Sequence, residues 1–289
     1  FIILPRAIVS ARRINEVLST NPKILNGTVT ETAESDKGTI EFKNVSFKYP
    51  DASDYVLRDI SFKAEKGKTI AFIGATGSGK STLINLIPRF YDATDGDVLV
   101  DGVNVKEYDI ESLNNKLGYV PQKAVMFSGT VSSNVAYGNN GRDNYSADDI
   151  KQAIKIAQGT EFVEKMENQY EGAIAQGGSN ISGGQKQRLA IARAVCRKPE
   201  IYIFDDSFSA LDYKTDRVLR SELKKETAGT TTLIVAQRIG TIKDADCIIV
   251  LDKGNMVGKG THSELMKNCE VYQQIALSQL SKEELGNDE

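Results

Sequence analysis

The sequence predicts an α/β sandwich whose parallel strands are buried on both faces. An apolar run over 69–73 leads directly into a glycine-rich turn and a helical pattern, as at the start of a strand–helix unit. After residue 198, short apolar runs again alternate with helical patterns. The middle of the chain, about 108–198, is mostly helical in pattern, so we expect it to form an inserted lobe.

The first 36 residues are expected to lie outside the globular domain. Apolar residues at helical spacing predict an amphipathic helix from residue 1 to about 20, which ends at Asn21-Pro22. The polar segment 26–37 has the composition of a linker. Because the chain opens on Phe1 rather than Met, we expect it to be a fragment of a longer protein.

The domain itself is expected to begin with strands. Residues 39–49 alternate, imperfectly, between apolar and polar side chains, which predicts a strand. The pair Asp101-Gly102 stands between short apolar runs within 97–105 and indicates a hairpin. Between these segments, a helix is predicted over 80–90.

The remaining helices are predicted from apolar residues at helical spacing, and the remaining strands from short apolar runs. The predicted helices cover 147–158, 160–168, 184–197 and 214–227, and the predicted strands cover 201–204, 231–236 and 247–251. The charged tail over 282–289 is expected to be frayed.

Composition narrows the class of protein. The chain has 289 residues, and 36 basic against 39 acidic side chains give a net charge of −3, which recommends neither a nucleic-acid partner nor a basic membrane face. Cys196, Cys247 and Cys269 lack the spacing of a metal site, so we expect reduced thiols in a cytosolic compartment. No apolar run approaches the roughly 20 residues that span a bilayer, and no signal peptide is recognised.

A phosphate-binding loop, or P-loop, is the strongest motif in the chain. Backbone N–H groups of such a loop converge on phosphate oxygens, while its lysine reaches the terminal phosphates and the following hydroxyl coordinates Mg²⁺. An ordinary glycine-rich turn would explain the glycines but not the Lys-Ser pair at this offset. The motif comprises Gly74, Ala75, Thr76, Gly77, Ser78, Gly79, Lys80, Ser81 and Thr82.

Two further segments have the chemistry of a nucleotide site. The apolar strand 201–204 ends in Asp205-Asp206, and Asp205 fits a carboxylate held near Mg²⁺ through water, although an acidic turn at a strand end is also common. Ser182, Gly183 and Gly184 precede a long helix and form a second anion cradle. Its simplest use is to close over a phosphate bound by another subunit; an ordinary N-cap is the alternative.

These motifs occur together in the order and approximate spacing of ATP-binding cassette (ABC) proteins. The chain resembles the nucleotide-binding domain of a multidrug-type ABC exporter from about residue 5 to residue 276. Supporting matches are the segments 45–49, 119–122, 181–185, 209–212 and 260–265, and 5–18 is similar to the segment after the last membrane helix of such exporters.

The resemblance implies a RecA-like P-loop core with an antiparallel β subdomain and a helical lobe over about 124–198. It implies that 1–36 are the end of a membrane-domain extension and a linker, and that 37–289 are the nucleotide-binding domain. The cofactors would be ATP and Mg²⁺. Two such domains would pair head to tail at the cytoplasmic face of the cell (inner) membrane, with transmembrane domains fused upstream. Residues 126–134 would face the coupling helices of the membrane part.

Site roles follow residue by residue from the resemblance. Tyr49 matches the aromatic residue that stacks on adenine, and the P-loop holds the phosphates. The metal ligands would be Ser81, Gln122 and Asp205. The catalytic set would be Gln122, Ser182, Gly184, Asp206, Asp212 and Gln237.

Two positions depart from the family pattern. The residue after the metal aspartate is usually Glu but is Asp206 here, and the switch position usually held by His is Gln237. A general base must come within ~2.6–3.2 Å of its proton, so a side chain one methylene shorter loses contact. Glutamine donates a hydrogen bond but carries no positive charge. We therefore expect a site that binds ATP and hydrolyses it slowly, as in the degenerate-site subunit of a heterodimeric bacterial exporter, with a non-identical partner.

The sequence is also compatible with other functions. Asp206 could act through an additional water, with Gln237 sufficient at the switch position in place of His. The chain would then be a homodimeric or soluble ABC ATPase with slow hydrolysis at both sites. An ABC ATPase acting on DNA or ribosomes would need a basic face, two cassettes in one chain or long coiled-coil inserts, and none of these is visible in the sequence. A GTPase or small-molecule kinase would leave the 181–185 signature unexplained. A regulatory subunit without turnover is the fourth possibility. No residue pattern in this chain indicates which substrate is transported.

Overall fold

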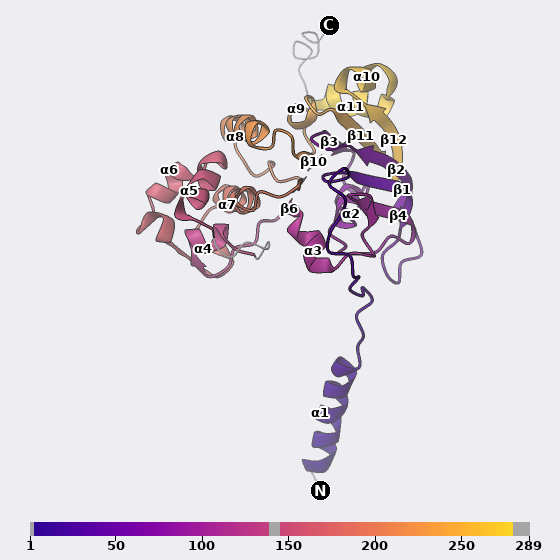
Figure 1. The fold of residues 1–289 in the computed structure, drawn as a ribbon, viewed down its shortest axis with the longest axis vertical. Helices are drawn as coiled ribbons and strands as arrows, with labels where there is room; N and C mark the ends of the chain where they lie inside the picture. The colour runs from indigo at the N-terminus through magenta and orange to yellow at the C-terminus, as the bar shows by residue number, and fades with distance from the viewer. Residues whose placement is uncertain (1–2, 139–144, 280–289) are drawn as a thin grey trace.

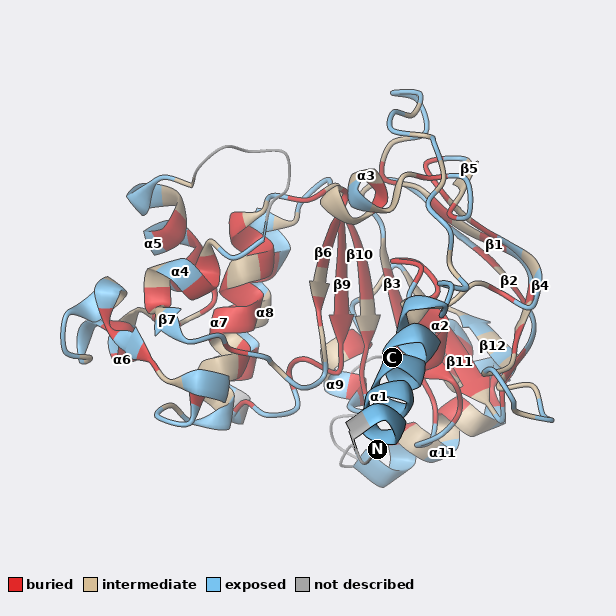
Figure 2. Cartoon of the chain, turned by 90° about the horizontal axis from the view of Figure 1, so that it is seen from below, coloured by how far each residue is buried: buried red, intermediate tan, exposed pale blue. Residues whose placement is uncertain are grey.

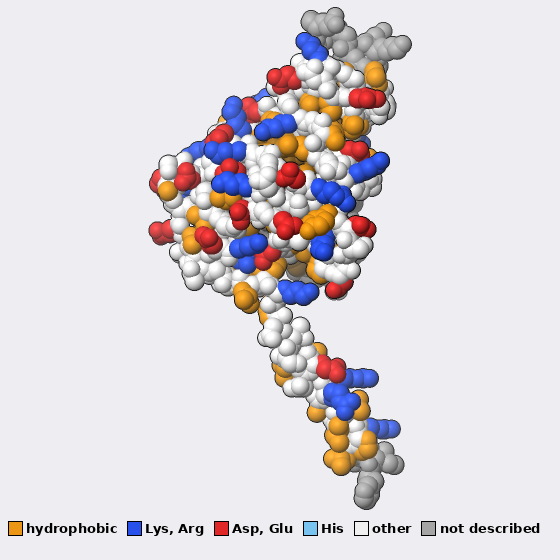
Figure 3. Space-filling view, turned by 90° about the vertical axis from the view of Figure 1, so that its right-hand side faces the viewer, with side chains coloured by type: hydrophobic (Ala, Val, Ile, Leu, Met, Phe, Trp, Pro, Cys, Tyr) orange, Lys and Arg blue, Asp and Glu red, His pale blue; other side chains and the backbone are white. Residues whose placement is uncertain are grey.

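The computed structural model describes residues 3–138 and 145–279, so the predicted frayed tail lies outside the described residues. A two-lobed body carries a helix, α1 (Ile3–Leu18), that stands away from it at the end of an extended segment (Figure 1). Apolar and basic side chains lie together along α1, with Leu4 66% and Val17 74% exposed (Figure 3). The predicted amphipathic helix is confirmed. Across the described ranges, no helix combines the length and hydrophobicity needed to cross a bilayer.

A six-stranded sheet forms the centre of the larger lobe, in the order β12-β11-β3-β10-β9-β6. Its strands pair in parallel except at β12, which runs antiparallel to β11. Every residue of β9 is buried, as expected for a strand covered on both faces. The strands are β3 (Thr69–Ile73), β6 (Leu117–Val120), β9 (Ile201–Asp205), β10 (Thr231–Val235), β11 (Cys247–Asp252) and β12 (Asn255–Gly260).

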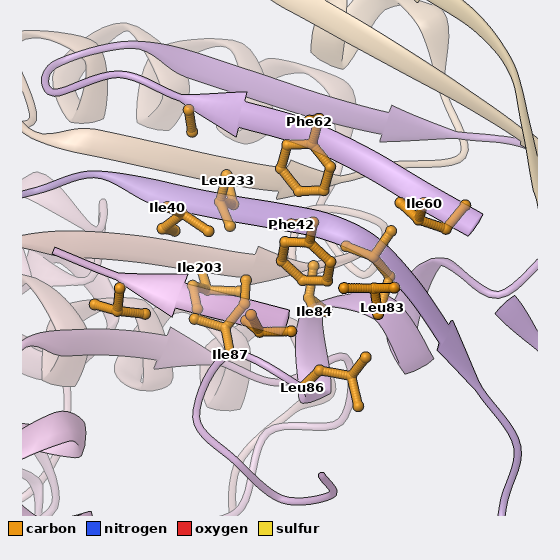
Figure 4. Close-up of a cluster of buried hydrophobic side chains, with 14 of the residues drawn as sticks. Ile40, Phe42, Ile60, Phe62, Leu83, Ile84, Leu86, Ile87, Ile203 and Leu233 are labelled. Carbon is orange, nitrogen blue, oxygen red and sulfur yellow. The ribbon is translucent and has the colours of Figure 1, made fainter. Parts of the chain in front are cut away.

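An antiparallel sheet in the order β2-β1-β4-β5 packs beside the central sheet. The predicted strand over 39–49 and the predicted hairpin over 97–105 are confirmed, whereas β2 was not predicted. Phe42 of β1 stacks on Phe62 of β2 with ring centroids 4.7 Å apart, next to Leu83 and Ile84 of α2 (Lys80–Asn85) (Figure 4). The strands are β1 (Ile40–Phe47), β2 (Leu57–Ala64), β4 (Asp95–Val100) and β5 (Val103–Asn104).

The predicted inserted lobe is present and its buried faces meet around α7 (Figure 2), but it does not begin near residue 108: α3 (Ile110–Asn115) lies with the sheet lobe and β6 is a strand of the central sheet, paired with β9. It contains α4 (Val131–Val135), α5 (Ala147–Ile156), α6 (Thr160–Glu164), the short strands β7 (Gly129–Thr130) and β8 (Ala173–Ile174), two 3₁₀ turns (Gln169–Glu171 and Gln176–Gly178) and α7 (Gly183–Cys196). The other helices are α8 (Tyr213–Glu226), α9 (Ile239–Ile242), α10 (His262–Asn268) and α11 (Glu270–Gln279).

Two predicted helices are shorter in the structure. The helix predicted over 80–90 ends at Asn85, because Pro88 disfavours helical geometry in the residue before it and Arg89 takes a left-handed φ of 59°. The helix predicted over 160–168 ends at Glu164, and Asn168 takes a φ of 60°. In both cases the apolar periodicity continues through turns that are not helical.

The segment with linker composition is attached to the domain. Gly27 N–H donates to the Tyr108 carbonyl at 2.9 Å, and Val29 N–H donates to the Glu107 carbonyl at 3.0 Å. Further along, the Lys116 ammonium lies 3.1 Å from Thr32 Oγ1. Polar composition alone did not predict this contact.

A buried ion cluster joins this segment to the starts of β6 and β9. Lys116 Nζ lies 2.8 Å from Asp101 Oδ2 and 3.2 Å from Glu200 Oε2, and the Asp101 side chain is fully buried. The second oxygen of Asp101 accepts the Gly38 N–H at 2.7 Å. Burial raises the pKa of Glu200, and Lys116 opposes that rise. Each buried charged group in the cluster is therefore stabilised by the opposite charge beside it.

We expect Lys116→Met to lower the free energy of unfolding by about 3–5 kcal/mol, because it leaves the Asp101 carboxylate buried without its counter-ion. Urea denaturation followed by circular dichroism measures this change. Lys225→Met is the matched control: Lys225 pairs with Glu222 on the surface, and an exposed pair contributes about 0–1 kcal/mol. Equal effects of the two variants would contradict the prediction.

Candidate functional site

The P-loop joins β3 to α2 and requires glycine for steric reasons. A Cβ on Gly74 would lie 2.1 Å from the Leu251 carbonyl oxygen, and Gly79 has a φ of 101° directly before α2. Lys80 Nζ donates to the carbonyls of Gly74 at 2.8 Å and Ala75 at 2.9 Å, so the ammonium lies in the centre of the loop. Burial lowers the pKa of Lys80, and the charges of Asp206 and Asp205 oppose that effect. The loop therefore presents one buried cation.

Asp205, at the end of β9, lies next to the P-loop. Ser81 Oγ donates to Asp205 Oδ1 at 2.8 Å, and the Tyr119 hydroxyl, which donates to Asn85 Oδ1 at 2.9 Å, lies 3.5 Å from Asp205 Oδ2. Burial raises the pKa of Asp205, and the hydrogen bond from Ser81 opposes that rise. Tyr119 was not among the predicted site residues, although it lies only three positions before Gln122.

This donor set fits Mg²⁺ held in part by phosphates. Mg²⁺ is commonly bound by one or two protein oxygens together with substrate phosphates and water. Ser81 and Asp205 supply a hydroxyl and a carboxylate in contact with each other. No group of three His, Cys, Asp or Glu side chains suited to a metal occurs in the described parts of the chain. Thus Ser81 and Asp205 would hold the ion on the phosphate side, with Gln122 as the third predicted ligand.

The Asp206 carboxylate accepts hydrogen bonds from two glutamines. Gln237 Nε2 donates to Asp206 Oδ2 at 2.7 Å, and Gln122 Nε2 donates to the same oxygen at 3.1 Å. Asp206 takes a left-handed φ of 46°, and its N–H donates to the Val235 carbonyl at 2.9 Å. Burial raises the pKa of Asp206, and the bonds from Gln122 and Gln237 oppose that rise.

One pocket gathers most of the predicted site. Its volume is about 240 Å³, and it lies where β3, β9 and β10 end. This position agrees with the rule that ligands bind at the carboxyl ends of parallel strands. The lining residues are Val56, Thr76, Gly77, Gly79, Lys80, Ser81, Thr82, Gln122, Asp206, Val235 and Gln237.

Tyr49 lies at the edge of the same region. Its hydroxyl is 2.9 Å from Thr82 Oγ1, the last residue of the P-loop motif. The ring packs edge-on against Phe47 and Tyr91, with centroids 5.0 Å and 5.2 Å apart. Tyr91, which was not predicted as a site residue, thus fixes the orientation of the Tyr49 ring. A broad hollow of about 950 Å³ lies beside Tyr49.

The second anion cradle lies apart from this pocket. Ser182 caps α7 in a capping box: its Oγ accepts the Gln185 N–H at 3.3 Å and its N–H donates to Gln185 Oε1 at 2.9 Å. A Cβ on Gly184 would lie 3.3 Å from the Ala210 carbonyl oxygen, so the α7 start contacts the segment that ends in Asp212. Asp212 in turn caps α8 through the Thr215 N–H at 3.0 Å.

None of Ser182, Gly184 and Asp212, all within the described ranges, lines the P-loop pocket. The Ser182 cap is exposed and belongs to the helical lobe, whereas Lys80 belongs to the sheet lobe (Figure 1). The structure therefore brings Lys80, Ser81, Gln122, Asp205, Asp206 and Gln237 together and leaves the α7 cradle open to another molecule.

This combination of sheet, P-loop and strand-end carboxylates defines a P-loop nucleotide-binding domain. Residues 57–209, more than half of the chain, match the ABC transporter family. The chain belongs to that family, as an ATP-binding domain with the α/β core, antiparallel β subdomain and helical lobe of an ABC ATPase.

Similar proteins agree with this assignment. An uncharacterized ABC transporter ATP-binding protein of Mycobacterium tuberculosis is 45% identical over 285 residues, covering 96% of this chain and 47% of the relative. The ATP-dependent lipid A-core flippase of Haemophilus influenzae is 39% identical over 276 residues, covering 96% and 46%. A solved structure of a bacterial Atm1-family ABC exporter with ATP bound superposes with a TM-score of 0.89 at 31% identity, covering 96% and 48%. The chain thus spans about half the length of these relatives.

Proposed function

We propose that this chain is the ATP-binding motor domain of an ABC exporter, and that its own nucleotide site binds Mg-ATP firmly but hydrolyses it slowly. Firm binding is supported by the complete P-loop, with the buried Lys80 and the Ser81–Asp205 pair beside it. Mg²⁺, when bound, would neutralise phosphate charge. This chain's own residues hold the phosphates and orient them.

Slow hydrolysis rests on a single observation, the double hydrogen bond to Asp206. A general base must face the attacking water, but Asp206 Oδ2 already accepts two amide N–H bonds, from Gln237 and Gln122. The side chain is also one methylene shorter than glutamate. Gln237 stays neutral at every pH, so it adds no charge near the γ-phosphate.

The exposed α7 cradle then serves a second molecule. We propose head-to-tail pairing in which Ser182 and the adjoining glycines contact the ATP held by a non-identical partner subunit, at the cytoplasmic face of the membrane. Transmembrane domains fused upstream of α1 would complete the transporter, and residues 126–134 would face them. No nucleic acid is expected as a partner, because the net charge is −3.

The proposal predicts little ATPase activity from this protein alone and strong activity on mixing with its partner subunit. ATP turnover of the full-length protein would be measured with and without that subunit. Lys80→Ala in the unmixed protein gives the background rate. Brisk hydrolysis by the protein alone, rising with its own concentration, would favour the homodimeric alternative and contradict the proposal.

A further inference from the structure

The last turn of α11 contacts the loop that contains Gln237. Gln279 Nε2 donates to the Gln237 carbonyl at 2.7 Å, and Gln279 Oε1 accepts the Ile239 N–H at 2.9 Å. One side-chain amide thus makes two hydrogen bonds to the backbone on both sides of Arg238. Gln279 lies 42 positions beyond Gln237, and no motif in the sequence pointed to it.

These two bonds take the place of a helix cap. Helix α9 begins after Arg238, which provides no side-chain cap in the described structure. The first N–H groups of a helix need partners from outside the helix, and Gln279 supplies one for Ile239. Gln237 and Arg238 are exposed between the buried residues Ala236 and Ile239, so core packing holds the ends of this loop and the bonds from Gln279 reach its exposed middle.

Helix α11 itself is firmly attached. Tyr272 and Ala276 are fully buried against the cluster that contains Leu265 and Ile239. The Tyr272 hydroxyl lies 2.7 Å from His262 Nδ1 of α10. In Figure 1, α11 lies beside α9 at the end of the sheet lobe. Helix α11 and the ends of the loop thus share one buried cluster, and Gln279 joins the last turn of the helix to the exposed part of the loop.

We propose that Gln279 is a positioning residue for this nucleotide site: it holds the backbone of 237–239 so that the Gln237 amide faces Asp206 and the phosphate pocket. The Gln237 amide lies 2.7 Å from Asp206 Oδ2, and both residues line the P-loop pocket. Gln279 does not line the P-loop pocket, and its two bonds to the backbone of 237–239 mean that it acts through the loop. This inference rests on the proposed function in one respect only: it assumes that the Gln237 side chain faces a nucleotide bound in this pocket.

The contact is tested first by hydrogen–deuterium exchange of the full-length protein, in peptides that cover 236–242. Gln279→Leu is expected to speed exchange of the Ile239 amide about tenfold, the size expected for one lost hydrogen bond. Gln274→Leu is the matched control, because Gln274 lies on the same helix, is exposed and bonds only to Glu270 among the contacts described. Unchanged exchange in Gln279→Leu would overturn the proposal.

The role is tested by a double-mutant cycle on ATP hydrolysis, with Gln237→Ala, Gln279→Leu and the double variant. We expect the two single variants to shift kcat in the same direction and by a similar factor of about tenfold, with an unchanged KM for ATP, because both displace the Gln237 amide from its place beside Asp206. The double variant should match Gln237→Ala alone. Gln279→Glu, which keeps the acceptor for Ile239 N–H and loses the donor to Gln237, should fall between the wild type and Gln279→Leu.

A further change of kcat in the double variant would mean that Gln279 acts on general stability, and an unchanged kcat in Gln279→Leu would remove its positioning role. Both results are ratios of kcat between variants of the same protein. The proposed function is judged instead by the absolute rate of the unmodified protein, so the two ideas can fail separately.

Discussion

Combining Asp206→Glu with Gln237→His is expected to raise ATP hydrolysis at this chain's own site by about 10²-fold or more. General acid–base contributions of this kind amount to ~10²–10⁴ in rate, which is about 3–5 kcal/mol of barrier. Glutamate extends the carboxylate by one methylene toward the attacking water. Histidine at 237 can carry the positive charge that glutamine lacks.

The two changes are expected to act together, because Gln237 Nε2 and Asp206 Oδ2 are in direct contact at 2.7 Å. Contacting residues are commonly non-additive, so each single variant should give less than half of the gain on a logarithmic scale. Turnover at saturating ATP measures the effect, and nucleotide affinity should stay within about twofold because the P-loop is untouched. An unchanged kcat in the double variant would count against an impaired site.

Local patterns were sufficient to predict the phosphate-binding part of the site. The P-loop glycines and Lys80 lie in one stretch of sequence, and the steric reason for Gly74 lies in its contact with a neighbouring strand. The strand ending in Asp205 could be recognised because an apolar run leads directly to the carboxylate. In the structure every residue of β9 is buried, which explains why the run is continuous. These features can be recognised locally in the sequence, although the steric cause at Gly74, the Leu251 carbonyl, comes from a distant segment.

The contacts between distant segments could not be predicted. Gln122 and Gln237 reach Asp206 from positions 84 and 31 residues away, and only the folded sheet brings their amides to one oxygen. Strand β2 was missed because its alternation is interrupted at Asp59, where φ is 48° and the register with β1 shifts nearby. A bulge of this kind destroys the period of two on which the prediction depended.

If the α7 cradle serves a partner's nucleotide, two substitutions in this chain should have very different effects on the ATP turnover of the assembled transporter. Ser182→Arg is expected to lower ATP turnover of the complex by about 10²-fold or more, the size seen when one phosphate- or oxyanion-facing donor is removed. Asp206→Asn should change the same turnover by less than about twofold, because the carboxylate it removes contributes little to hydrolysis under the proposed function.

A matched control separates the cradle from helix stability. Ser146 caps α5 in the same lobe with the same kind of capping box as Ser182. Ser146→Arg should therefore cost a similar ~0.5–2 kcal/mol of stability while leaving turnover intact. The three variants would be compared by steady-state ATPase of the purified complex, with thermal unfolding as the stability measurement. If Asp206→Asn stops turnover while Ser182→Arg preserves it, this chain's own site is the hydrolytic one, and the division of labour between the two subunits is reversed.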